Sequence, residues 1–164
     1  MRFSLIDRIV ELDKGQSITT VKNLSLAEEY LQDHFPGFAV MPGVLMVEAC
    51  VQSGAWLMRA TEGFKYSTVL LKEAKAVKFN SFVTPGKQLR VTLKTHKWGE
   101  GECTFKATSS VEGESAVSCR LTLQQLNLRD RNESMAESDE QLIDKMKELY
   151  NQLWIPEPAE ETIS

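Results

Sequence analysis

A histidine and a glutamate stand out by their types and spacing in the stretch HFPGFAVMPGVLMVEACVQ, residues 34–52. His34 precedes two Pro-Gly pairs, and Glu48 lies inside an almost wholly apolar run. An imidazole acts as a base near neutral pH. Burial among apolar side chains disfavours the charged form of a carboxylate, so a buried Glu48 is suited to donate a proton. We therefore expect the two residues to act as an acid–base pair.

Gly43 adds a third group, at the predicted start of a helix. The first N–H groups of a helix have no partner within it, and the helix dipole favours negative charge at that end. A glycine also lets a ligand approach the backbone closely. A base, an acid and an oxyanion-type donor thus lie within 15 residues of each other. These are the parts needed to remove a proton beside a carbonyl and to expel a neighbouring hydroxyl.

The long element from Gly43 to about Thr61 consists mainly of helix-forming residues, with apolar side chains on nearly every face. Such a helix has to be enclosed on most sides. Pro42, Glu48 and Gln52 interrupt the apolar stretch and are costly in lipid. We therefore predict a buried helix of a soluble protein instead of a membrane span.

Segments rich in β-branched residues, several with alternating apolar and polar positions, predict the strands that enclose this helix. They are residues 3–12, 18–25, 67–79, 88–98, 103–111 and 115–126. Short turns with glycine separate most of them, which predicts antiparallel pairing. Residues 26–33 are expected to form a short helical or irregular connection. The predicted fold class is α+β, with about six strands around one central helix.

The composition changes after Leu128. Residues 1–128 are expected to form one domain, and the charged residues 129–138 a linker. Residues 139–155 have the periodicity of an amphipathic helix, which Ser138 and Gln141 would start with a capping box. Its apolar stripe needs a partner, either the domain's own sheet, a neighbouring subunit, or a ligand tunnel that it covers. Residues 156–164 are expected to be a disordered tail.

The composition also limits the function and the compartment. The net charge of −4 argues against bulk binding of nucleic acid. The three cysteines, Cys50, Cys103 and Cys119, lack metal-ligand spacing and are expected to be reduced thiols in the core. Charged residues interrupt the N-terminal apolar positions, so no export signal is predicted. These features predict a cytoplasmic protein.

The stretch at 34–52 resembles the active-site segment of the (3R)-hydroxyacyl-acyl-carrier-protein dehydratases of the FabZ/FabA type, whose pattern is close to HFPGxPxMPGVLxxEAxAQ. LIDRIVEL at 5–12 resembles the family's VDRVLEL opening strand. AVKFNSFVTPGKQL at 76–89 resembles its AKFRRPVVPGDQL strand and turn. The resemblance covers roughly residues 4–126.

The resemblance implies a hotdog fold, in which an antiparallel sheet wraps a long helix, and a homodimer at least; whether dimers assemble into tetramers or hexamers is left open. Each active site would pair His34 of one chain, as the base, with Glu48 of the other, as the acid. The N–H of Gly43 would polarise the thioester carbonyl, and Gln52 would support the acid. A glutamate at position 48, where isomerising relatives have aspartate, implies dehydration alone.

The resemblance also implies a partner and a form of substrate. The partner is acyl carrier protein, which carries the 3-hydroxyacyl group on its phosphopantetheine arm, and no metal or dissociable redox cofactor is implied. Asn80 and Ser81 stand where the family often has two arginines that help to dock the acidic carrier. Basic residues nearby either compensate or are ordinary solvated charges: Lys72, Lys75, Lys78 and Arg59. Ala39 replaces a proline of the pattern, which would loosen the loop of His34.

Two other functions fit the same fold. One is a hotdog thioesterase that hydrolyses the thioester, and the other is a non-catalytic subunit for acyl-thioester binding or assembly. His96 is expected to be an exposed strand residue, and we assign no function to it, to Trp98 or to Trp154.

Overall fold

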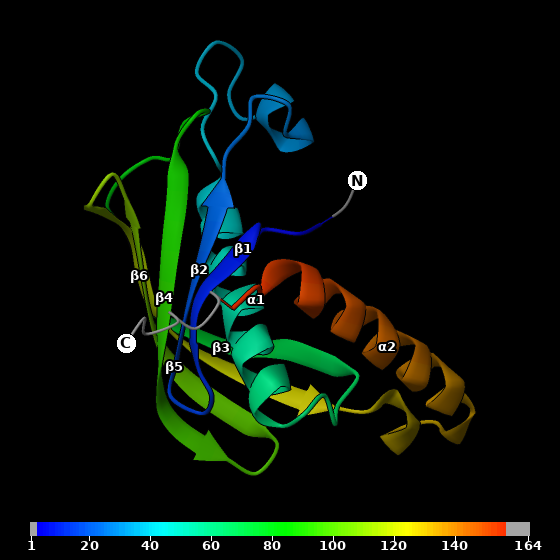
Figure 1. Cartoon of the computed structure of the whole chain (residues 1–164). Helices are drawn as coiled ribbons and strands as arrows, with labels where there is room; N and C mark the ends of the chain where they lie inside the picture. The colour runs from blue at the N-terminus through cyan, green and yellow to red at the C-terminus, as the bar shows by residue number, and fades with distance from the viewer. Residues whose placement is uncertain (1–2, 157–164) are drawn as a thin grey trace, which may run out of the picture.

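The computed structural model describes residues 3–156, which form an antiparallel sheet bent around one long helix (Figure 1). The strands are β1 (Arg8–Asp13), β2 (Ser17–Asn23), β3 (Thr68–Phe79), β4 (Gln88–Gly99), β5 (Glu102–Val111) and β6 (Glu114–Leu126), in the sheet order β1-β2-β4-β5-β6-β3. The helices are α1 (Gly43–Thr61) and α2 (Ala136–Leu153), with short 3-10 helices η1 (Glu29–Gln32), η2 (Leu128–Asp130) and η3 (Glu133–Met135). The predicted α+β class with a central helix is confirmed.

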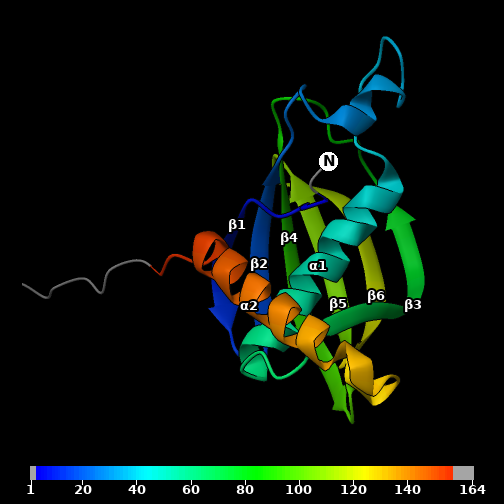
Figure 2. The same cartoon turned by 90° about the vertical axis from the view of Figure 1, so that its right-hand side faces the viewer.

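The helix α1 lies on the concave side of the sheet. The helix α2 crosses α1 on the side of α1 that faces away from the sheet (Figure 2). The apolar side chains of α1 therefore meet the sheet on one face and α2 on another, as the sequence predicts for a helix that is apolar nearly all round. The helix approaches the sheet closely at Gly54, where an added Cβ would lie 2.8 Å from Cδ1 of Leu123. Any larger residue at this position would have to displace side chains of the packed core.

The predicted strands agree closely with β3, β4, β5 and β6, but the first one begins later than predicted. Residues 3–7 precede β1 and pass across α1 (Figure 1). Leu5 and Ile6 are buried there, and the N–H of Leu5 donates to the side chain of Gln52 and not to a neighbouring strand. The apolar pattern of this segment therefore records packing against the helix, which sequence alone does not distinguish from a strand.

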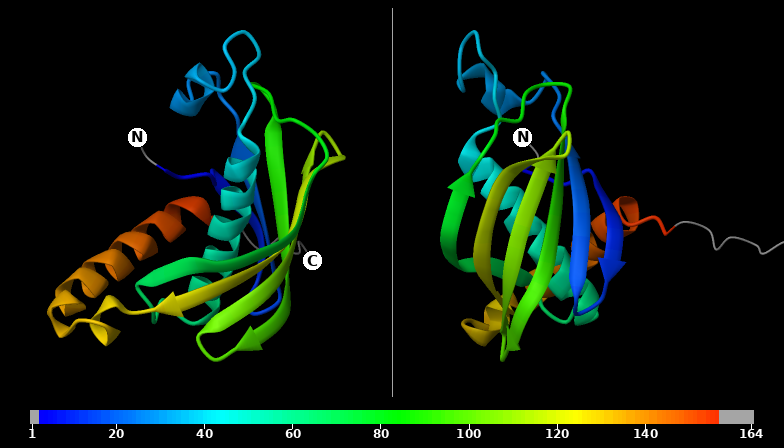
Figure 3. Two further views of the ribbon diagram at one scale, coloured as in Figure 1. Left: turned by 180° about the vertical axis from the view of Figure 1, so that it is seen from behind. Right: turned by 90° about the vertical axis from the view of Figure 1, so that its left-hand side faces the viewer.

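The strand β3 forms one edge of the sheet and is exposed along almost its whole length (Figure 3). Several of its apolar side chains are exposed as well, among them Leu70, Leu71, Val77 and Phe79. An exposed edge with apolar side chains can pair with another chain. The single chain therefore leaves this edge available for association.

The C-terminal helix differs from the prediction at its start. α2 begins at Ala136, so that η2, η3 and the first residues of α2 occupy most of the predicted linker. The predicted capping box is wrong, since Ser138 makes no capping hydrogen bond and Gln141 donates to Glu137. Asp139, which is fully buried, instead holds the first turn of the helix by accepting from Ser67 Oγ and from the N–H groups of Leu128 and Arg129.

The apolar face of α2 packs on the domain's own core. Tyr150 lies 6.2 Å from the ring of Trp56 on α1 and 5.3 Å from that of Phe64, and Leu153 is buried in the core cluster. Trp154 forms a parallel bridge with Ile9 of β1. The tail predicted at 156–164 lies outside the described residues apart from Pro156.

Candidate active site

The loop that carries His34 is a narrow, hydrogen-bonded turn. The N–H of Val40 donates to the carbonyl of His34 at 3.1 Å. The N–H of Phe35 donates to the carbonyl of Phe38 at 3.1 Å, and the N–H of Phe38 donates to the carbonyl of Phe35 at 3.0 Å. Met41 then donates to Val83 O at 2.9 Å, which ties the loop to the segment after β3. These four backbone bonds hold the loop although Ala39 replaces the proline of the family pattern.

One hydrogen bond determines which nitrogen of His34 carries the proton. Nδ1 lies 3.0 Å from the carbonyl oxygen of Val40. A carbonyl oxygen only accepts, so Nδ1 must donate, and in the neutral imidazole Nε2 then has a free lone pair. The ring is thereby oriented and left with one basic atom. This is the arrangement that a general base requires.

His34 and Gly43 line the same pocket, of about 440 Å³. Its other lining residues are Phe35, Val40, Met41, Met46, Phe79, Asn80, Ser81 and Phe82. Gly43 begins α1 after Pro42, so its N–H has no partner within the helix. A Cβ at Gly43 would lie only 2.8 Å from Cε1 of Phe79, so that a glycine is needed beside the ring.

Glu48 and Gln52 do not line this pocket. Glu48 follows Gly43 by five positions, which places it about 7.5 Å further along the helix and about 140° around it. It is half-buried in the single chain, so the expectation of full burial is wrong for one chain alone. Gln52 Nε2 donates to Glu48 Oε1 at 3.2 Å. The structure thus brings together His34 with Gly43, and Glu48 with Gln52, but not the two pairs.

The N-terminal segment contributes to the second pair, which the sequence did not predict. The N–H of Leu5 donates to Gln52 Oε1 at 2.9 Å, and Gln52 Nε2 donates to the carbonyl of Phe3 at 3.2 Å. Both contacts use backbone atoms, so neither residue type signals them. The only available signal was the four-residue spacing of Glu48 and Gln52, which predicts their own contact.

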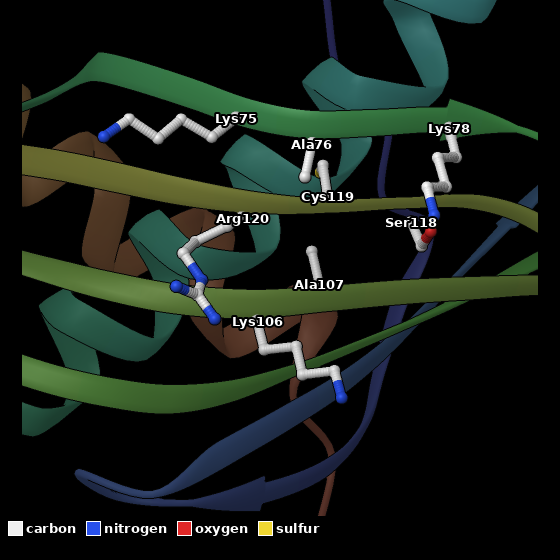
Figure 4. A pocket seen from close by; sticks show the side chains of 8 residues that line it. All are labelled: Lys75, Ala76, Lys78, Lys106, Ala107, Ser118, Cys119 and Arg120. Carbon is white, nitrogen blue, oxygen red and sulfur yellow. The ribbon is translucent and has the colours of Figure 1, made fainter.

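A second hollow, of about 480 Å³, lies on the sheet and is lined by basic side chains of β3, β5 and β6 (Figure 4). Lys94 pairs with Lys106, Lys106 with Arg120, and Arg120 with Lys75 in the strand register. We call these four residues the cationic row. It crosses four strands, or three spacings of about 4.8 Å each. Like charges directly opposite each other destabilise a sheet.

Few carboxylates compensate this row. Lys75 Nζ lies 3.2 Å from Glu73. No other member of the row has a carboxylate partner within 4.0 Å among residues 3–156. Two of the basic residues named from the sequence are engaged elsewhere. Lys72 pairs with Glu102 at 2.6 Å, and Arg59 lies over the ring of Trp56 at 5.2 Å, where burial lowers its pKa to about 10.

The other residues named in the sequence analysis lie outside the pocket of His34 and Gly43 and contribute to the structure alone or make no contact that suggests a function. His96 is exposed, as expected. The indole N–H of Trp98 donates to Gly15 O at 3.0 Å. The three cysteines are buried and unpaired, as expected.

Comparison with known proteins identifies the family. Residues 1–120 match the FabA-like domain. The chain belongs to the FabA-like family. The 3-hydroxyacyl-[acyl-carrier-protein] dehydratase FabZ of Staphylococcus haemolyticus is 42% identical over 122 residues, which are 73% of this chain and 83% of the relative. That of Levilactobacillus brevis is 40% identical over 117 residues, 71% of this chain and 79% of the relative. The family predicted from the motif at 34–52 is thereby confirmed.

Solved structures confirm the hotdog fold. The dehydratase heterocomplex ApeI:P from Xenorhabdus doucetiae superposes with a TM-score of 0.65 at 16% identity, and the match covers 82% of this chain and 90% of that chain. The protein smu.793 from Streptococcus mutans, bound to acetyl CoA, superposes with a TM-score of 0.58 at 13% identity, and the match covers 77% of this chain and 93% of that chain.

Within residues 3–156, no helix is long and apolar enough to cross a membrane. In the same range, no group of three or more His, Cys, Asp or Glu residues is arranged to hold a metal ion.

Proposed function

We propose that this chain dehydrates 3-hydroxyacyl thioesters, linked to acyl carrier protein, to trans-2-enoyl thioesters in fatty-acid biosynthesis. Membership of the family and the dehydratase relatives support this activity. The observation in the structure that supports it best is the bond from His34 Nδ1 to the carbonyl of Val40, because it leaves Nε2 as a base in the pocket that Gly43 also lines.

The reaction follows from these groups. His34 Nε2 takes the proton on the carbon next to the thioester carbonyl, and the electrons of that C–H bond form the new double bond. The N–H of Gly43 stabilises the negative charge that develops on the carbonyl oxygen. The bond from the next carbon to its hydroxyl breaks, and Glu48 gives that hydroxyl a proton so that it leaves as water. Proton return from His34 to Glu48 completes the cycle.

The site is complete only across a dimer in this proposal. Within one chain, Glu48 lies about 140° around α1 from Gly43, so it does not face the pocket of its own His34. The exposed edge strand β3 is next to this pocket, because Phe79, Asn80 and Ser81 line it. Pairing of two β3 edges places the partner's helix beside the pocket. His34 of one chain then works with Glu48 of the other.

The cationic row is the surface proposed to receive the acidic carrier protein. Asn80 and Ser81 supply no charge, and Arg59 and Lys72 are engaged in other contacts. Lys78 lines the hollow on the sheet beside the cationic row. It is followed directly by Phe79, which lines the pocket of His34 and Gly43. A carrier bound there sits next to the pocket that its phosphopantetheine arm must enter. Attraction between the acidic carrier and the basic side chains would offset the repulsion among the four members of the row.

The test is turnover of a 3-hydroxyacyl thioester, presented on carrier protein and on a coenzyme A analogue, by the wild type, His34→Ala and Glu48→Gln. We expect 2-enoyl product from the wild type and losses of at least about a hundredfold in kcat from both variants, which still form dimers. Hydrolysis without dehydration would favour the thioesterase alternative. Binding without either reaction would favour the non-catalytic one.

Carrier docking is tested separately with Lys106→Glu combined with Arg120→Glu. We expect a higher KM for the carrier-linked substrate and an unchanged KM for the coenzyme A analogue. Lys147→Glu, which adds the same kind of charge on the exposed face of α2, serves as the control. Equal effects on the two substrates would reject the row as the docking surface.

A further inference from the structure

The orientation of the Gln52 amide is fixed by the backbone of the N-terminal segment. The N–H of Leu5 can only donate, so the atom of Gln52 that faces it at 2.9 Å must be the carbonyl oxygen. The carbonyl of Phe3 can only accept, so it must face the amide nitrogen, at 3.2 Å. Turning the amide over would set donor against donor and acceptor against acceptor. Only one orientation of Gln52 therefore fits.

This orientation determines what Gln52 presents to Glu48. One N–H of its amide nitrogen bonds Phe3, and the other donates to Glu48 Oε1 at 3.2 Å. An oxygen that accepts this bond is not the one that carries the acidic proton, because a carboxyl O–H is a poor acceptor. The proton of Glu48 therefore belongs on Oε2. The amide of Gln52 does not bond Oε2, so the acidic O–H of Glu48 points away from Gln52.

We propose that the backbone of residues 3–5 is a positioning element of the active site, which orients the acid Glu48 through Gln52. The inference rests on the proposed function, in which Glu48 is the acid. All three hydrogen bonds lie within one chain. The segment of one chain consequently prepares the acid that acts in the partner's pocket.

The segment is anchored firmly enough for this function. Leu5 and Ile6 are only 3% and 2% exposed. The next residue, Asp7, accepts from the N–H of Asn23 at 2.6 Å and donates its own N–H to the carbonyl of Val21 at 2.8 Å.

A buried lysine strengthens this anchor. Lys22 is 6% exposed and lies 3.6 Å from Asp7 and 2.8 Å from Glu28. A lysine this deeply buried requires such partners. It ties the N-terminal segment to β2, and through Glu28 it ties down the connection that leads to the loop of His34. Both halves of the proposed site are thus attached to the same strand.

The experiment compares Gln52→Glu and Leu5→Pro with the wild type on a 3-hydroxyacyl coenzyme A thioester, with kcat measured against pH. Gln52→Glu keeps the size of the side chain but replaces the donor to Glu48 by a second carboxylate. Repulsion between the two carboxylates favours the protonated acid, so the alkaline limb of the kcat profile should move to higher pH while kcat falls at least tenfold. Leu5→Pro removes the N–H that bonds the amide oxygen of Gln52 and should lower kcat without raising KM.

The control is Gln16→Glu, which adds the same charge in an exposed turn and should behave as the wild type. If Gln52→Glu keeps the kcat and the pH profile of the wild type, or if Leu5→Pro keeps the kcat of the wild type, the positioning function is refuted. The same holds if Gln52→Glu loses activity without any movement of the limb, because a merely structural residue would behave in that way. A wild type that dehydrates neither thioester refutes the proposed function instead, so the two failures are distinguishable.

Discussion

Two inactive variants should restore each other's activity if the active site lies across the dimer. Consider a chain with His34→Ala mixed with a chain with Glu48→Gln. In the mixed dimer one site combines both defects, and the other combines the intact His34 of one chain with the intact Glu48 of its partner. This expectation follows from the geometry of α1, on which Glu48 faces about 140° away from the pocket-lining Gly43.

The recovered activity can be calculated. Random exchange of equal amounts makes about half of the dimers mixed, and each of these has one working site out of two, so the mixture should reach about a quarter of wild-type activity. The assay is turnover after co-expression or after joint refolding of the two chains. The matched control pairs His34→Ala with the double variant, and no combination of these chains has an intact site. A mixture that is no more active than its components would show that each site is built within one chain.

Three further predictions concern packing, the oxyanion donor and pH. Gly54→Ala should lower stability by about 1–3 kcal/mol in a denaturant titration, since its Cβ would lie 2.8 Å from Leu123 in the core. Gly43→Ala should lower kcat/KM at least tenfold with little change in melting temperature, because the exposed ring of Phe79, 2.8 Å from the new Cβ, would turn into the pocket.

The pH prediction, the third, concerns Asp139. Burial opposes ionisation of Asp139, but hydrogen bonds from Ser67 and from the N–H groups of Arg129 and Leu128 outweigh it and lower its pKa. A lowered pKa in the folded state means stability that is present above the unfolded value of about 3.9 and is lost as the pH falls through the folded value. Melting temperature should therefore fall more steeply below about pH 4 for the wild type than for Asp139→Asn. Parallel curves would contradict this.

The parts of the fold that sequence predicted well are those in which one chain determines the pattern. The alternation of Leu89, Val91 and Leu93 with polar residues marks β4 because one face of the sheet is buried within the chain. The all-apolar surface of α1 predicted its enclosure for the same reason. His34 and Gly43 meet because a short loop connects them.

The parts that sequence did not predict depend on contacts without a residue signature. Full burial of Glu48 was expected from its neighbours along the helix, but in a single chain that face of α1 is only partly covered. The segment at residues 3–7 was predicted as a strand from its apolar residues, but its two buried side chains, Leu5 and Ile6, are adjacent in sequence and pack where the segment crosses α1. The start of α2 was missed because its anchor, Asp139, bonds residues that are distant in sequence, such as Ser67.

The two edges of the sheet are unequal, and this limits how large the assembly can grow by strand pairing. At one edge, Trp154 occupies the backbone of β1 at Ile9, so another strand cannot add there in register. At the other edge, β3 is open. When two identical open edges meet about a twofold axis, each consumes the other, and only blocked edges are left outside. Because the C-terminal helix ends against β1, it limits strand pairing to the β3 edge. Pairing can therefore form a dimer but cannot continue from chain to chain into a fibre.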